Sequence, residues 1–131
     1  MGAPDHTTMT QTQQYIINDF MALCHQRSVD AGWYKDPATG APLDRNVGEM
    51  IALIHSEISE ALEGYRKRLN DDHLPQRPMI EVELADTVIR IGDLAGYLSL
   101  DIGGAIAEKL EYNLHREDHQ IETRAKGGKR F

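Results

Sequence analysis

The chain has 131 residues, with 21 acidic and 14 basic side chains and a formal charge of −7. This length suits one domain with its own core. An acidic chain with only 6% aromatic residues lacks the basic patches and stacking surfaces that nucleic acids and anionic membranes require. No apolar run approaches a membrane span or a signal core, and Cys24 is the only cysteine. We therefore expect a cytoplasmic protein without disulfides.

Turn signals divide the first half of the chain into a tail and two helices. Residues 1–11 are expected to form a flexible tail, and apolar residues at helical spacing predict a helix over 12–27. Glycine and proline residues then interrupt the pattern. Asp44 or Asn46 is placed to cap a second helix, predicted over 47–69.

Two further helices are predicted in the second half. Pro78 suits the first turn of a helix that continues to about Leu98. Asp101 is placed to cap a helix over 102–118, and residues 119–131 are expected to form a basic tail. No convincing strand alternation is present. The sequence therefore predicts one all-α domain over 12–118.

The predicted third helix is apolar over most of its circumference. Its main stripe contains Leu84, Val88, Ile91 and Ala95. Such a helix is usually central and covered on more than one side, and four helices in a short chain supply little cover. We therefore expect a four-helix bundle that is completed by homo-oligomerisation, in a homodimer or homotetramer. The alternative is a monomer in which the other helices bury this one.

Two acidic pairs are the candidate functional residues. Glu57 and Glu60 lie on the second predicted helix, and Glu83 and Asp86 lie on the third, each pair at spacing i, i+3. This spacing projects both carboxylates of a pair from one side of a helix. Two such pairs on adjacent helices would form a cage of four carboxylates, which suits Mg²⁺ or Mn²⁺ and not zinc.

Acidic pairs at this spacing are also common on solvated helix surfaces. Two positions favour a site. Glu57 borders the apolar stripe of its helix, whereas Glu83 and Asp86 interrupt an otherwise apolar helix. Carboxylates in such positions repel one another, and a cation relieves the repulsion. Further candidate ligands are Glu63, Glu81 and Asp93.

The fourth predicted helix carries a cationic strip. Lys109, Tyr112 and Arg116 follow the spacing i, i+3, i+7, and Asn113 lies beside them. Two cations, a phenol and an amide on one strip suit phosphates, a base edge or a sugar hydroxyl. The alternative is an ordinary solvated face whose cations pair with neighbouring glutamates.

The two acidic motifs and the cationic strip together resemble the MazG-type all-α nucleoside triphosphate pyrophosphohydrolases, over residues 12–118. The sequence segment from His55 to Gly64, which contains Glu57 and Glu60, strengthens the resemblance. The resemblance implies a Mg²⁺-dependent housecleaning hydrolase that cleaves (d)NTPs between the α and β phosphates, giving the monophosphate and pyrophosphate. It also implies dimers or tetramers with sites formed partly between subunits.

The resemblance also implies roles for individual residues. Four carboxylates would ligate the metal, and one of them or a neighbour would orient or deprotonate the attacking water: these are Glu57, Glu60, Glu83 and Asp86. The triphosphate, sugar or base would be held by Lys109, Tyr112, Asn113 and Arg116. Trp33 is expected either to stack on the base or to pin its loop to the core. His25 is a weaker candidate for the pocket lining, with a structural role as the alternative, and His55 is a candidate to support the acidic motif that it precedes.

Other activities remain open from the sequence. One is a non-catalytic helical oligomer that binds a nucleotide or a partner protein. Others are a related all-α reaction on phosphoribosyl-ATP or a dUTPase-like reaction. The basic segment 126–130 is expected to be a disordered end or, alternatively, a cover over phosphates. No Walker-type loop precedes a strand, so no P-loop is predicted.

Overall fold

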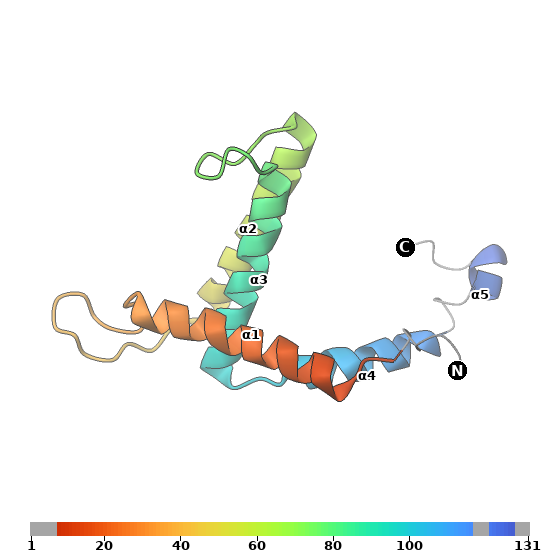
Figure 1. Cartoon of the computed structure of the whole chain (residues 1–131), viewed down its shortest axis with the longest axis horizontal. Helices are drawn as coiled ribbons and strands as arrows, with labels where there is room; N and C mark the ends of the chain where they lie inside the picture. The colour runs from red at the N-terminus through yellow and green to blue at the C-terminus, as the bar shows by residue number, and fades with distance from the viewer. Residues whose placement is uncertain (1–7, 117–120, 128–131) are drawn as a thin grey trace. The chain divides into compact units, whose positions relative to one another are not determined.

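A computed structural model describes residues 8–116 and 121–127 of the chain. Within these ranges the regular elements are helices, and no strand is present. The helices are α1 (Gln11–Asp30), α2 (Val47–Lys67), α3 (Met79–Leu98), α4 (Ile102–Leu114) and α5 (Ile121–Ala125) (Figure 1). The all-α prediction is confirmed for this part of the chain.

The contacts divide the chain into two compact units. The hairpin unit comprises residues 20–100 and contains the second part of α1, together with α2 and α3. The terminal unit combines residues up to Asp19 with those from Asp101 onward, and therefore contains the first part of α1 and α4. The candidate acidic pairs lie in the hairpin unit, and the candidate cationic strip lies in the terminal unit.

Local signals set the ends of α2 and α3. Asn46 caps α2, because its side chain accepts a hydrogen bond from the backbone N–H three residues later. Arg68 and Ser99 end α2 and α3 in the left-handed region, with φ of 53° and 55°. Pro78 is predicted inside the first turn of α3, but it lies just before the helix with an extended ψ of 139°. Its ring and missing N–H are tolerated there.

Helices α2 and α3 lie side by side and pack closely (Figure 1). A Cβ atom at Gly64 would lie 2.7 Å from Cγ of Met79, so the Met79 side chain occupies the space that a larger residue at this position would need. On α3, a Cβ atom at Gly92 would lie 2.7 Å from Cβ of Cys24 on α1. Glycines therefore bring α2 and the second part of α1 against α3.

The hairpin unit has a small apolar core that includes carboxylates. Its buried apolar side chains are Met21, Cys24, Met50, Ala61 and Ala95. Glu57, Glu83 and Thr87 are buried beside them, and the Thr87 hydroxyl donates to the backbone carbonyl of Glu83 at 2.9 Å. Buried carboxylates destabilise a fold unless they are neutralised or hydrogen-bonded. The carboxylates between α2 and α3 therefore need protons, hydrogen bonds or cations to offset the cost of their burial.

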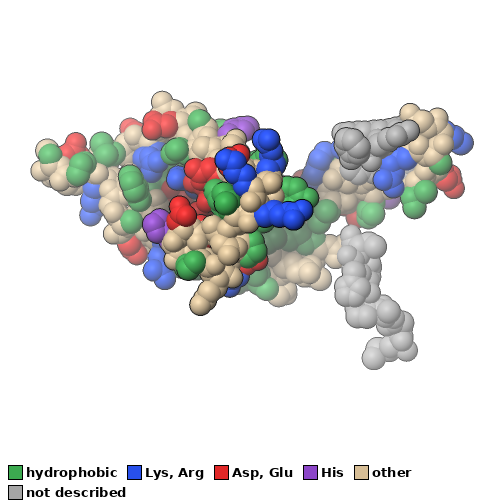
Figure 2. Space-filling view, turned by 90° about the horizontal axis from the view of Figure 1, so that it is seen from above, with side chains coloured by type: hydrophobic (Ala, Val, Ile, Leu, Met, Phe, Trp, Pro, Cys, Tyr) green, Lys and Arg blue, Asp and Glu red, His purple; other side chains and the backbone are tan. Residues whose placement is uncertain are grey.

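Large apolar side chains of the predicted α3 stripe, and of α2, are exposed in the single chain, so the other described helices do not fully bury them there. Leu84 and Val88 on α3 are 45% and 43% exposed, whereas Ala95 is buried. Ile58 and Leu62 on α2 are likewise exposed. Figure 2 shows hydrophobic side chains reaching the surface between charged ones. The buried residues of α2 and α3 include the acids Glu57 and Glu83 together with small residues such as Ala61 and Ala95, while these larger apolar side chains stay at the surface.

In the terminal unit, Asn18 of α1 is hydrogen-bonded to the start of α4. Its Oδ1 accepts from the N–H of Gly103 and its Nδ2 donates to Asp101, both at 2.8 Å. Asp101 also accepts from the N–H of Gly104, which confirms its prediction as a cap. Helix α4 ends at Leu114, before the predicted end near 118. Continuation would place two acidic residues in the last turn, against the helix dipole.

The predicted tails are described only in part. Helix α1 begins at the end of the range 1–11, and the five-residue helix α5 lies within the range 119–131. Of the basic residues in the segment 126–130, only Lys126 lies within the described residues. The predicted domain boundaries therefore remain predictions. None of the described helices is long and apolar enough to cross a membrane.

Candidate metal centre

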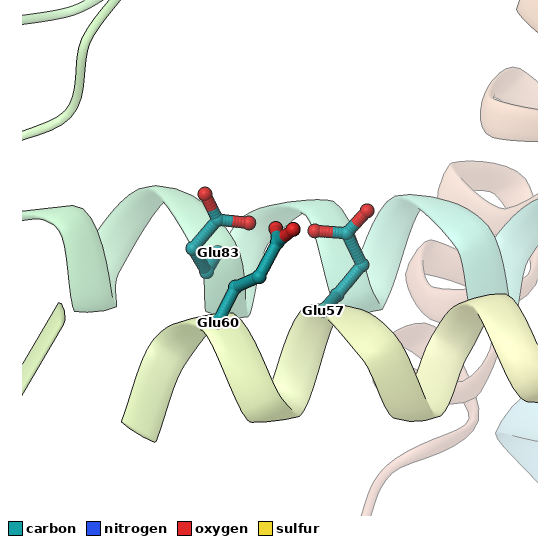
Figure 3. A group of neighbouring side chains, drawn as sticks. All are labelled: Glu57, Glu60 and Glu83. Carbon is teal, nitrogen blue, oxygen red and sulfur yellow. The ribbon is translucent and has the colours of Figure 1, made fainter. Parts of the chain in front are cut away.

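Three carboxylates from two helices converge inside the hairpin unit. Glu57 and Glu60 project from α2, and Glu83 projects from α3 (Figure 3). One carboxylate oxygen from each residue lies within 4.8 Å of those from the other two. Glu57 and Glu83 are buried, whereas Glu60 is exposed and opens the group to solvent. Three oxygen ligands at this separation can hold one hard divalent cation.

The electrostatics of the group favour a bound cation. The pKa of Glu83 is raised to about 8, first because hydrogen bonding with Glu57 favours its protonated form, and then because it is buried near Glu60. Burial also raises the pKa of Glu57, but hydrogen bonds with Glu83 and Arg90 hold it below its ordinary value overall. Oε2 of Glu83 is buried and has no hydrogen-bond partner among the described residues. Such an orphaned oxygen is a ready ligand atom.

Asp86, the fourth predicted ligand, lies outside this group of three. Its pKa is raised by burial and then by the charge of Glu57, while Arg90 opposes the increase. Asp86 and Glu57 also line the same cavity. Asp86 is therefore coupled electrostatically to the cluster without sharing its closest geometry, so its metal-binding role remains a prediction.

A cavity of about 550 Å³ adjoins the acidic cluster within the hairpin unit. Its wall combines acidic side chains with three arginines and one aromatic ring, among them Glu57, Asp86, Arg27, Arg45, Arg90 and Trp33. Its volume lies in the range of small-molecule sites. Trp33 is 64% exposed in the single chain, so it does not pin its loop to a core there and instead borders the cavity.

Arg90 is the functional candidate that sequence reasoning missed. Its Nε donates to Oε1 of Glu57 at 2.9 Å, and the side chain is 41% exposed. A signal for it was present, because Arg90 follows Asp86 by four residues and Glu83 by seven on α3 and therefore shares their face.

Asp93 connects α3 with α1 and with the loop after it. One oxygen contacts Nδ1 of His25 at 3.0 Å and accepts from the Tyr34 hydroxyl at 2.7 Å, and the other accepts from Ser28 at 2.9 Å. The Tyr34 ring stands edge-on to His25, and Arg45 lies over it. Asp93, an expected auxiliary ligand, is not in the group of three carboxylates and instead positions the loop that carries Trp33.

The two cations of the predicted cationic strip lie near the ring of Tyr112 in the terminal unit. Lys109 Nζ lies 4.6 Å from the ring centroid of Tyr112, and the guanidinium of Arg116 lies 6.0 Å from it. Arg116 lies beyond the end of α4, which corrects its predicted helical position. Oδ1 of Asn113 is buried without a hydrogen-bond partner in the part of the chain that is described. Contact of this strip with a substrate remains a prediction. His55, which precedes the first acidic pair on α2, is exposed.

Comparisons with protein-family models, with curated proteins and with solved structures return no match for this chain.

Proposed function

We propose that this chain is a Mg²⁺-dependent nucleoside triphosphate pyrophosphohydrolase of the MazG type, with Mn²⁺ as an alternative metal. The observation that carries the proposal is the convergence of Glu57, Glu60 and Glu83 beside a cavity of about 550 Å³. Carboxylate oxygens without sulfur or imidazole ligands suit Mg²⁺ and Mn²⁺. The buried, unpartnered oxygen of Glu83 is the atom that most needs a cation.

The residues of the hairpin unit have distinct roles in this proposal. Glu57, Glu60 and Glu83 hold the metal, which when bound offsets phosphate charge and lowers the pKa of a bound water. Asp86 lines the cavity with a raised pKa, so its carboxylate is suited to take the proton from the attacking water. The water oxygen bonds to the α phosphorus as the anhydride bond between the α and β phosphates breaks, and pyrophosphate leaves with the electron pair of that bond. Trp33 borders the space available to the base.

A second copy of the chain would cover the exposed apolar stripes of α2 and α3. Ile58, Leu62, Leu84 and Val88 are each more than 40% exposed in the single chain. Leaving such large apolar side chains in water forgoes burial free energy, which association recovers. This supports a homodimer or homotetramer, in which the other subunit can contribute to the site.

The test is pyrophosphate release from a panel of NTPs and dNTPs, including dUTP, with Mg²⁺ and the full chain. Glu60→Gln should lower kcat at least about a hundredfold because it removes a metal ligand, and Asp86→Asn should lower it as much because it removes the proton acceptor. Glu63→Gln is the matched control, because Glu63 lies on α2 and pairs with Lys67 outside the cluster. Far-ultraviolet circular dichroism should show unchanged helicity.

Two outcomes contradict the proposal. The enzymatic proposal fails if no nucleotide is hydrolysed at saturating metal, and calorimetric nucleotide binding without turnover would instead support the non-catalytic binding module. The site assignment fails if Glu60→Gln and Asp86→Asn both hydrolyse nucleotides as the wild type does.

A further inference from the structure

Arg90 connects the acidic cluster to the adjoining cavity. Its Nε donates to Oε1 of Glu57, and its side chain lines the cavity together with Arg27 and Arg45. We infer that Arg90 is a phosphate-binding residue, which places an anion in this cavity directly beside the metal-binding carboxylates. This inference rests on the proposed function. It adds to that function a positively charged side chain, Arg90, from the hairpin unit that also holds the acidic cluster.

The donor geometry of Arg90 suits a phosphate group. A guanidinium carries five N–H donors in a planar fork that matches two phosphate oxygens at once. Among the described residues, the only hydrogen-bond partner of the Arg90 side chain is Glu57, through Nε. The terminal nitrogens therefore remain available, and the 41% exposure of the side chain leaves them accessible. Arg45 is less available, because its guanidinium lies over the Tyr34 ring.

Glu57 would have two positively charged partners, Arg90 and a bound metal ion, and their charges act on the same carboxylate. In the metal-free chain the positive charge of Arg90 compensates the buried carboxylate of Glu57. A divalent cation held by Glu57, Glu60 and Glu83 would offset two of their three negative charges. An anion beside Arg90 in the adjoining cavity is then repelled less than it is without the metal. Anion binding should consequently depend on prior binding of the metal.

The opposing interpretation is that Arg90 serves only to neutralise Glu57. That role predicts lower stability when Arg90 is replaced, but it predicts no change in the affinity for an anion. The two interpretations therefore differ in a binding constant and not merely in folding.

The experiment measures binding of inorganic pyrophosphate to the full chain in Mg²⁺ by isothermal titration calorimetry. Arg90→Gln should bind pyrophosphate about ten- to a hundredfold more weakly, because a charge-assisted bidentate contact is lost. Arg90→Lys should lose about three- to tenfold, because it keeps the charge without the planar fork. The control is Arg77→Gln, which removes an exposed arginine paired with Glu81 outside the cavity and should match the wild type.

A second readout separates anion binding from the metal site. Mn²⁺ affinity, measured by electron paramagnetic resonance without pyrophosphate, should be unchanged or tighter in Arg90→Gln, because a neighbouring positive charge is removed. Mn²⁺ binding more than about tenfold weaker would show instead that Arg90 organises the carboxylates, and would overturn the inference. If Arg90→Gln does not fold, Arg90→Lys decides the question, since wild-type pyrophosphate affinity in that variant also overturns it.

The inference and the proposed function fail in different ways. Arg90-dependent pyrophosphate binding without hydrolysis of any nucleotide would remove the enzymatic proposal and keep the phosphate-binding role of Arg90. Nucleotide hydrolysis with unchanged KM and kcat in Arg90→Gln would remove that role and keep the enzyme. Absence of pyrophosphate binding to the wild type in Mg²⁺ would also overturn the inference.

Discussion

Replacing Glu83 by glutamine should remove a large part of the pH dependence of folding stability in the metal-free chain. Glu83 is only 8% exposed, and one of its oxygens is buried without a partner among the described residues. Hydrogen bonding with Glu57, burial and the nearby Glu60 raise its pKa from the ordinary 4.5 to about 8. Glutamine has a similar shape and is neutral at every pH, so Glu83→Gln imitates the protonated form.

The sign and size of the effect follow from linkage between proton binding and folding. A carboxyl with a raised pKa binds its proton more tightly in the folded chain than in the unfolded chain. Its contribution to stability is therefore complete below the unfolded pKa and is lost as the pH rises through the folded one. For a folded pKa near 8, the wild type should lose about 3–5 kcal/mol more than Glu83→Gln between pH 5 and pH 9. The lowered pKa of Glu57 acts below this window.

The assay is urea unfolding at pH 5 and pH 9 with a chelator, at one protein concentration, followed by circular dichroism. Adding Mg²⁺ at pH 9 should stabilise the wild type, since a ligand that binds only the folded state shifts the equilibrium toward it, and should stabilise Glu83→Gln much less. The control is Glu63→Gln, which changes an exposed acid of α2 that pairs with Lys67, and it should retain the wild-type profile. Profiles of the wild type and Glu83→Gln that remain parallel within about 1 kcal/mol would refute the reasoning.

Two further predictions concern packing. Leu62→Lys should shift the protein from oligomer to monomer in sedimentation velocity, because Leu62 is 58% exposed in the single chain and an oligomer interface would bury the new charge. Leu74→Lys is the control in the α2–α3 loop, and a monomeric wild type would contradict the prediction. Gly64→Ala should lower the free energy of unfolding by about 1–3 kcal/mol, because the new Cβ would lie 2.7 Å from the Met79 side chain. A change below about 0.5 kcal/mol would contradict this prediction, because it would show that Met79 adjusts freely.

Local sequence signals were sufficient to predict helices α1 to α4 but not α5, and to predict Asp101 as a cap and Asn46 as one of two candidate caps. The side chains of Asn46 and Asp101 accept hydrogen bonds from backbone N–H groups three residues later, so these caps depend only on local sequence. The i, i+3 spacing likewise placed Glu57 beside Glu60 on one side of α2. Such interactions are local and depend only on helical geometry.

The orientation of the helices could not be predicted in the same way. On helix α3, Leu84 of the apolar stripe and Glu83 are about 100° apart, and hydrophobicity alone favours burying Leu84. In the single chain Glu83 is buried and Leu84 is exposed, and Gly92 of the same helix lies against Cys24. Three-dimensional contacts of this kind also determine that Arg90 pairs with Glu57.

The metal-free cluster is neutralised in two different ways, and this difference bears on function. Glu83 retains a proton at neutral pH because its pKa is near 8, whereas Glu57 is ionised beside Arg90. A divalent cation would displace the proton of Glu83 and offset two of the three negative charges of the cluster. Metal binding should therefore release a proton and, in the same event, reduce the repulsion that an anion meets beside Arg90. This coupling gives an acidic protein a local phosphate-binding site. The affinity of that site depends on the metal that the proposed chemistry requires.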